Sequence, residues 1–311
     1  MKRVAVLAIL AAALGACQRS PDAIPAAPAR AGARAGSTPE AAPAAVARDP
    51  LPHPLLWSVE KDGHTTYFFG TMHRGVDAAS RLPAIVWNKL DAARAFAMEA
   101  DLDDPALADA IRPTERSLRD TLGDTYWTKL EGAIGPGTAR AVEHLPPLVS
   151  ASALSMRGLP QTEAMDKVLS ARAAGEHKPV VFLEPATRQL ALLGKWMDTR
   201  ALKMMLDELP EGEQHARAML DAYVSGDERR IVTLADDERG DALRHGYTAA
   251  EYDREITELL YERNASWIAA LEKLHEGGGG FVAVGTLHLV GPRSVLDLLA
   301  RKGYRVTRLA P

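Results

Sequence analysis

One short pattern occurs near both ends of the chain and restricts its possible folds more than any other feature. Residues 281–284 (FVAV) form an unbroken apolar run, and residues 285–288 (GTLH) follow it directly. Residues 66–69 (TYFF) run into residues 70–73 (GTMH) in the same way. In both copies a helical pattern and a short strand come next. This alternation predicts an α/β fold, and the continuous apolar strands predict a central mixed or parallel sheet with helices on both faces.

The first copy is preceded by a hairpin signal. Apolar runs at residues 55–59 and 66–69 flank an Asp-Gly pair at residues 62–63, and this arrangement favours a tight β-hairpin turn. After the first GTMH, apolar residues at helical spacing predict a helix. Residues 95–98 then predict a short strand that ends at Glu99.

The second copy and the middle of the chain contain the other strands. Residues 295–299 predict a short helix that Gly303 ends, and residues 304–306 predict a final strand. Residues 179–183 predict one more buried strand, which ends at Glu184. The rest of the middle is mostly helical. We therefore expect two related strand–GxxH–helix–strand halves with a helical insertion between them.

A long helix is predicted from Thr248 to about His275. Thr248 and Glu251 form a capping-box pattern at its start. At 100° per residue one face carries an apolar stripe, formed by Ile256, Leu260, Trp267, Leu271 and Leu274. Arg263 falls within this stripe, and a buried arginine needs an anionic or carbonyl partner because its guanidinium does not deprotonate.

The histidines of the two repeated motifs are the first candidates for a functional site. A residue just past the end of a buried strand lies where open α/β sheets bind ligands. Gly70 and Gly285 allow the backbone to turn tightly at these strand ends. One such histidine would equally well have a structural role. Two histidines in matching units, His73 and His288, predict convergence on one site.

Two carboxylates are expected at the same edge of the sheet, because Glu99 and Glu184 also lie at predicted strand ends. Two imidazoles with one or two carboxylates suit a divalent metal such as Zn, Mn, Fe or Co, which would acidify a bound water and polarise a carbonyl. Alternatively, the glutamates pair with Arg263 or other cations in a structural network. For Glu184 the functional and the structural interpretation are nearly balanced. For Glu99, which lies beside the first motif, a place in the functional site is favoured. Other histidines are expected at the surface, among them His53, His144, His177, His215 and His245.

Composition excludes several classes of protein. The chain has 37 Lys and Arg against 41 Asp and Glu, and this weak acidity argues against a nucleic-acid partner. A single cysteine excludes an intramolecular disulfide and a cysteine-rich metal centre. The sequence contains no HExxH, GxSxG, Walker A or GxGxxG motif.

The N-terminus has the features of an export signal. Two basic residues precede an apolar run at residues 4–14, whose length is typical of a signal-peptide core rather than a membrane span. Residues 14–17 (LGAC) resemble the bacterial lipobox, so residues 1–16 are expected to be removed and Cys17 to be lipidated. The mature chain then has no free thiol, which excludes catalysis by a cysteine nucleophile.

Residues 17–50 are predicted to be the lipidated cysteine and a disordered tether, since Ala and Pro dominate this segment and it has too few large apolar side chains to fold. Gln18 follows the cysteine where a retention-type lipoprotein would have Asp. We therefore expect a protein anchored in the outer membrane that faces the periplasm. Residues 51–311 are expected to be the folded domain.

These residues resemble the TraB/PrgY/GumN family, whose domain is shared with the Tiki proteins. The family's two GxxH motifs correspond to residues 70–73 and 285–288. A glutamate after the first helix corresponds to Glu99. An LET-like motif followed by a glutamine corresponds to residues 183–185 with Gln189, although proline replaces the threonine here.

An Arg-Asn pair of the family corresponds to Arg263 and Asn264, and Asp166 lies where the family often carries aspartate. The resemblance covers about residues 55–309. It implies a fold similar to that of erythromycin-esterase-like and ChaN-like proteins. Because Tiki proteins are proteases that need Mn or Co, it also implies a metal-dependent hydrolase that acts on peptide bonds.

The resemblance further implies a role for each site residue. His73, His288 and Glu99 are expected to be ligands of a divalent metal (Mn, Co or Zn). Glu184 would be a ligand or a general base. Arg263 would orient a carboxylate or stabilise an oxyanion.

Two functions of different classes remain open. The first is a lipid-tethered metallopeptidase or metallohydrolase with a peptide or small-molecule substrate. The second is a lipoprotein that binds a peptide, a metal or haem without turnover, as ChaN-like proteins suggest. A role in envelope polysaccharide or secretion systems is a weaker third. The sequence separates the first two poorly, because residues that bind and residues that catalyse are of the same types.

Overall fold

The computed structural model describes residues 49–101 and 103–310. The predicted signal peptide, the lipidated Cys17 and nearly all of the predicted tether lie outside these residues. The expected α/β fold is confirmed: a six-stranded mixed sheet has the strand order β4-β3-β5-β2-β1-β6. Its strands are β1 (Leu56–Lys61), β2 (His64–Thr71), β3 (Phe96–Met98), β4 (Val180–Phe182), β5 (Phe281–Gly285) and β6 (Arg305–Arg308). None of the helices described here is long and apolar enough to cross a membrane.

The hairpin predicted at the start of the domain is present. β1 and β2 pair antiparallel, and Lys61 faces His64 across the turn. Asp62 and Gly63 have φ values of 50° and 80°, which are the left-handed conformations that a two-residue hairpin turn requires. β1 also pairs antiparallel with β6, whereas β4, β3, β5 and β2 are mutually parallel.

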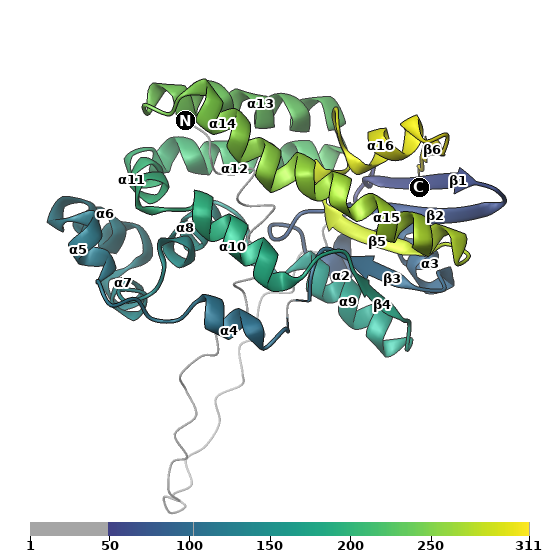
Figure 1. The fold of residues 1–311 in the computed structure, drawn as a ribbon, viewed down its shortest axis with the longest axis horizontal. Coiled ribbons are helices and arrows are strands. Elements are labelled where there is room, and N and C mark those ends of the chain that lie inside the picture. Colours follow the sequence, from purple (N-terminus) through teal and green to yellow (C-terminus); the bar gives the residue numbers. More distant parts are fainter. Residues whose placement is uncertain (1–48, 102, 311) are drawn as a thin grey trace, which may run out of the picture.

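Helices cover both faces of the sheet, as expected (Figure 1). On one side lie α2 (Ala78–Arg81), α3 (Ala84–Ala92) and α9 (Met165–Gly175), and on the other α15 (Glu262–Glu276) and α16 (Val295–Arg301). The chain moves in one direction across the sheet from β2 through β3 to β4, and in the opposite direction from β4 through β5 to β6. Because crossovers between parallel strands are right-handed, this reversal places the two sets of helices on opposite faces.

The predicted helical insertion is also present, and Figure 1 shows most of it on the left, beyond the sheet. Its first part precedes α9 and consists of α4 (Ala106–Ala110), α5 (Leu118–Leu122), α6 (Asp124–Ile134), α7 (Pro136–Ala141) and α8 (Pro147–Ser155). Its second part follows β4 and consists of α10 (Ala186–Trp196), α11 (Thr199–Asp207), α12 (Leu209–Ser225), α13 (Glu228–Arg244) and α14 (Ala249–Ile256).

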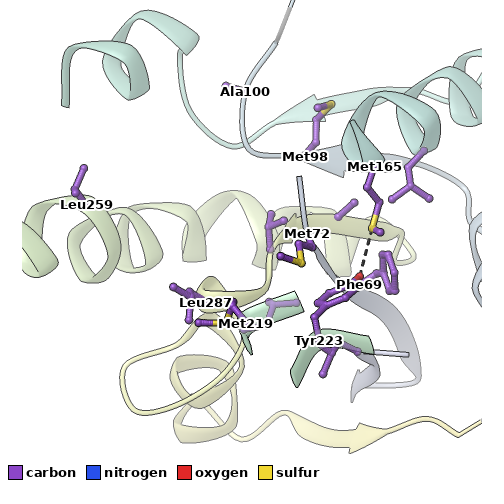
Figure 2. Packing of buried hydrophobic residues seen from close by; sticks show 14 of the residues in the cluster. Phe69, Met72, Met98, Ala100, Met165, Met219, Tyr223, Leu259 and Leu287 are labelled. Atoms are coloured by element: carbon purple, nitrogen blue, oxygen red, sulfur yellow. Dashed lines mark hydrogen bonds between the residues drawn. The ribbon is translucent and has the colours of Figure 1, made fainter. Parts of the chain in front are cut away.

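The core continues from the sheet into the helical part beneath the strand ends. Phe281 of β5 packs between Phe69 and Phe96, at ring-centre distances of 6.2 and 6.4 Å. Figure 2 shows side chains from several segments packed together close to the ends of β2 and β3, including Met72, Met98, Met165, Met219 and Leu287. Tyr223 of α12 donates a hydrogen bond to the carbonyl oxygen of Gly70 at 2.8 Å, so the insertion is tied directly to the first motif.

Three sequence predictions need correction. β4 is an edge strand rather than a buried one, and Phe182 is 42% exposed. The long helix is interrupted by a π-helical turn, η2 (Thr257–Tyr261), between α14 and α15, although the capping box of Thr248 and Glu251 is confirmed. His215 is buried rather than at the surface, because α12 packs against α13 and places the imidazole 3.5 Å from a carboxylate oxygen of Glu238.

Candidate functional site

The two repeated motifs lie side by side in the sheet. β2 and β5 are neighbouring parallel strands, and Thr71 of the first motif is in register with Gly285 of the second. The hydroxyl of Thr286 donates a hydrogen bond to the carbonyl oxygen of Thr71 at 2.9 Å. A Cβ on Gly70 would lie 2.9 Å from Oγ1 of Thr286, so the close approach of the motifs requires glycine at this position.

His73 is held by a carboxylate from α9. Its Nδ1 lies 3.4 Å from Oδ2 of Asp166, in the first turn of α9, and Thr71 donates to the other oxygen of Asp166 at 2.7 Å. An acceptor beside Nδ1 favours the tautomer with its proton on Nδ1, which leaves a lone pair on Nε2. Nε2 of His73 is buried and has no hydrogen-bond partner in the described part of the chain. This pairing of a carboxylate with a histidine is suited to general base catalysis.

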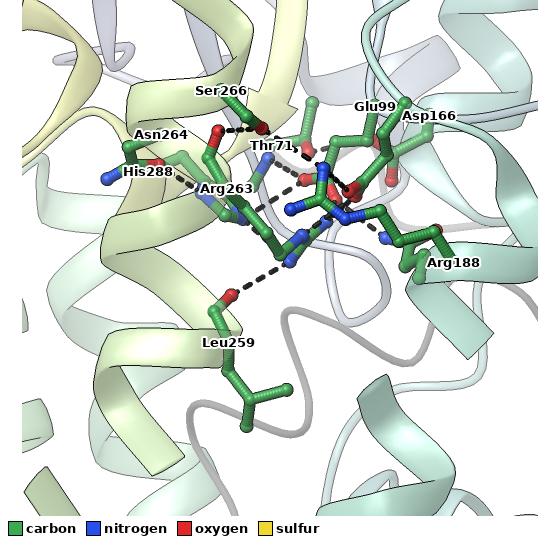
Figure 3. Close-up of polar contacts among 12 residues, drawn as sticks. Thr71, Glu99, Asp166, Arg188, Leu259, Arg263, Asn264, Ser266 and His288 are labelled. Carbon is green, nitrogen blue, oxygen red and sulfur yellow. Dashed lines mark hydrogen bonds and ion pairs between the residues drawn. The ribbon is translucent and has the colours of Figure 1, made fainter. Parts of the chain in front are cut away.

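A second group of side chains forms around Arg263, next to the first (Figure 3). Nη2 of Arg263 donates to Oε2 of Glu99 at 2.7 Å, and Nε donates to Oε1 of Glu184 at 2.7 Å. The other N–H groups contact Glu184 again, the carbonyl oxygen of Leu259 and Nε2 of His288. The guanidinium therefore donates four hydrogen bonds and makes a further ion-pair contact with Glu184, and this favours a role in positioning the carboxylates over a role in binding an oxyanion.

His288 is fixed by a chain of hydrogen bonds from α15. Asn264 uses its amide nitrogen to donate to the carbonyl oxygen of Arg293 at 3.0 Å, so its oxygen faces Nδ1 of His288 at 2.6 Å. Nδ1 of His288 therefore carries the proton, and Nε2 accepts from Arg263. Burial lowers the pKa of His288 to about 3, so the imidazole is neutral at physiological pH.

The two carboxylates of this group have pKa values shifted in opposite directions. Burial favours a higher pKa for Glu99, but His288, Arg263 and the backbone N–H of Gly285, 2.8 Å from its Oε1, outweigh burial and lower the pKa. For Glu184 burial dominates and raises the pKa despite the contact with Arg263. Oε2 of Glu184 is buried without a hydrogen-bond partner among the described residues. Glu99 is thus the stable anion, and Glu184 is the better proton donor.

Of the predicted site residues, the structure brings together Glu99, Glu184, Arg263 and His288, which were expected from four separate segments. His73 contacts Asp166 and, within residues 49–101 and 103–310, forms no hydrogen bond or ion pair with these four. Arg263 has its predicted anionic partners.

Thr71, which holds Asp166, was not predicted from the sequence as a site residue. The signal for it was available, because threonine occurs at the same place in both GTxH motifs and is buried in both. Gln189, noted only through the family resemblance, donates to Oε2 of Glu99 at 2.8 Å.

The donor atoms around Arg263 do not fit a divalent metal in this arrangement. Glu99 and His288 were expected to be metal ligands together with His73, but the permanently charged guanidinium of Arg263 contacts both. Across residues 49–101 and 103–310, no three or more His, Cys, Asp or Glu side chains are placed to hold a metal ion. A cation would have to displace Arg263, which cannot lose its charge by deprotonation.

Comparison with known proteins agrees with the extent of the fold. The sequence matches the TraB/PrgY/gumN family over residues 55–308. It is 24% identical over 265 residues to the uncharacterized protein YbaP of Escherichia coli (strain K12). The aligned region covers 78% of this chain and 96% of that protein. The protein of the same name from Shigella flexneri is 25% identical over the same shares. No solved structure matches the chain. The chain therefore belongs to the TraB/PrgY/gumN family.

Proposed function

We propose that the protein is a hydrolase that cleaves peptide bonds on the periplasmic side of the cell envelope, with His73 as its general base. The observation that carries the proposal is the buried Nε2 of His73, which has no partner among the described residues while Asp166 lies beside Nδ1. Buried polar atoms are nearly always hydrogen-bonded, so this nitrogen is suited to accept a proton from a water or hydroxyl group. The lipobox-like N-terminus supports the location.

In the proposed reaction, Nε2 of His73 takes a proton from the water that attacks the peptide carbonyl. Asp166 stabilises the imidazolium that forms and keeps the ring in place, and Thr71 holds Asp166. Glu184 donates a proton from Oε2 to the nitrogen of the leaving amine, a role for which its raised pKa is suited. Glu99 stays ionised and fixes Arg263, which in turn holds Glu184. No step in this scheme uses a metal.

The test is digestion of a peptide library by the full chain, with products identified by mass spectrometry. His73→Gln should reduce cleavage by about 10²–10⁴-fold, the usual contribution of a general base. His144→Gln, a change at an exposed histidine, is the matched control and should have no effect. A wild type that cleaves no peptide, or a His73→Gln variant with full activity, would refute the proposal.

The pH dependence tests the role of Glu184 separately. A proton donor must be protonated, so activity should fall as the pH rises through the raised pKa of Glu184. The Glu184→Gln variant should lose this alkaline decline along with most of its activity. An unchanged pH profile in that variant would assign the proton donor to another group.

A further inference from the structure

A cavity next to the Arg263 group has no role in the proposed reaction. It has a volume of about 310 Å³ and lies between α13, the π turn η2 and the loop that follows His288. This volume is at the small end of the range typical of ligand pockets, about 300–1,000 Å³. Its interior is apolar, with Leu287 and Val290 buried at its base and Ala235 and Leu260 in its walls.

Four charged side chains line this cavity; Arg239 and Asp253 form an ion pair at 3.1 Å, whereas Arg293 and Asp236 have no such partner among the described residues. Arg293 lies over the ring of Tyr261, 4.1 Å from its centre, and Asp236 is exposed on α13. Within the described ranges 49–101 and 103–310, neither residue forms an ion pair. Both charges act on the hydroxyl of Tyr261, whose pKa is raised mainly by burial, lowered by Arg293 and raised by Asp236. Asp236 and Arg293 both line the cavity, so the two charges lie at the same opening.

The cavity is built from the segments that hold the candidate site. Leu287 precedes His288, and Leu260 and Tyr261 precede Arg263 in the chain. The carbonyl oxygen of Arg293 accepts the hydrogen bond from Asn264, whose own oxygen fixes His288. A ligand in the cavity would therefore contact the same two segments that position the arginine and the histidine.

We propose that this cavity binds a short peptide that carries both of its terminal charges. An apolar side chain fills the interior, the carboxylate pairs with Arg293, and the ammonium group faces Asp236. Charge complementarity selects this ligand, because an apolar pocket with one unpaired cation and one unpaired anion at its mouth matches a zwitterion with an apolar body. That the bound peptide is a substrate or product of the neighbouring site rests on the proposed function; the binding itself does not.

The test is calorimetric titration of the full chain with the dipeptide leucyl-phenylalanine, its N-acetyl form and its C-terminal amide. The free dipeptide should bind with a dissociation constant below about 1 mM. Each blocked form should bind about tenfold more weakly, because it lacks one charged contact. Arg293→Gln should remove the preference for the acid over the amide, and Asp236→Asn the preference for the free amine.

Ala235→Trp, which fills the cavity from α13, should abolish binding of all three peptides, whereas Arg229→Gln, a change at an exposed arginine of the same helix, should not. Circular dichroism of each variant establishes that it is folded. The titration is repeated in His73→Gln, so that a failure of catalysis is distinguished from a failure of binding. No binding by the wild type, or an unchanged acid-to-amide ratio in Arg293→Gln, would overturn the proposal.

Discussion

Replacing Arg263 with methionine tests whether the guanidinium holds two buried carboxylates in place. The side chain of Arg263 is 1% exposed, that of Glu184 is 0% exposed and that of Glu99 is 13% exposed. Methionine fills much of the same volume but leaves both carboxylates without their cation. Removing one partner of a buried ion pair costs about 3–5 kcal/mol of unfolding free energy. For a domain of this size, we expect the melting temperature to fall by roughly 6–10 °C.

The loss of stability in this variant should depend on pH in a defined direction. In the wild type, the pKa of Glu99 is lowered, so its stabilising contribution is present above its ordinary pKa of 4.5 and is lost as the pH falls. The pKa of Glu184 is raised, so its contribution is present at low pH and is lost as the pH rises through the raised value. Without Arg263, the pKa of Glu184 would rise further and that of Glu99 would rise from its lowered value. The deficit should therefore be largest near pH 8 and shrink towards pH 5 as the carboxylates are protonated.

Denaturant unfolding at pH 5 and pH 8 measures this deficit directly. Arg188→Met is the matched control, because Arg188 lies 3.8 Å from the same Glu184 but has a side chain that is 42% exposed. Because the guanidinium of Arg188 stays in contact with solvent, this ion pair contributes at most about 1 kcal/mol, so the control should change little. Glu99→Gln and Glu184→Gln combined with Arg263→Met should recover part of the lost stability. A deficit below about 1 kcal/mol, or one that is equal at both pH values, would refute the proposed electrostatic role.

Two further predictions follow from the packing of the motifs and from the place of Arg263. Gly70→Ala should cost about 1–3 kcal/mol of unfolding free energy, because the new Cβ would meet Thr286 and Leu55. Gly132→Ala is the control and should be neutral or stabilising, because a Cβ there meets nothing within 4 Å. Equal effects of the two substitutions would contradict the packing argument. Chelation with EDTA, or addition of Mn, Co or Zn, should change the peptide cleavage rate by less than about twofold, because Arg263 contacts the expected ligands. Loss of activity on chelation that Mn restores would contradict this arrangement.

The positions of the candidate residues along the sheet were predictable from the sequence, because parallel strands present their carboxyl ends at one edge. Glu99, Glu184 and His288 each follow a strand of the parallel group, and the structure places them in contact with one another or with Arg263. Strand order did not have to be known for this prediction. It required only that the strands be parallel, which the alternation with helices indicated.

The partners of these residues were less predictable, because they come from helices distant in the sequence and depend on side-chain geometry. Asp166 reaches His73 from α9, and Gln189 reaches Glu99 from α10, across 93 and 90 residues of chain. Two imidazoles and two carboxylates suggest a metal when they are counted as residue types. The choice between a metal and a guanidinium depends on the depth to which Arg263 enters the group, which sequence spacing does not define.

The π turn η2 contacts both Arg263 and the cavity beside the site. A continuous helix would bury Ile256 and Leu260 on the same face as Arg263, as the sequence predicted, but the structure buries Leu259 and leaves Ile256 and Leu260 half-buried at the cavity. The wider turn shifts the buried face by one position, and the carbonyl oxygen of Leu259 then accepts a hydrogen bond from Nη1 of Arg263 at 3.0 Å. π turns occur often at functional sites. Here one irregular turn both supports the arginine and forms a wall of the cavity, so a change that restores a regular helix should disturb both.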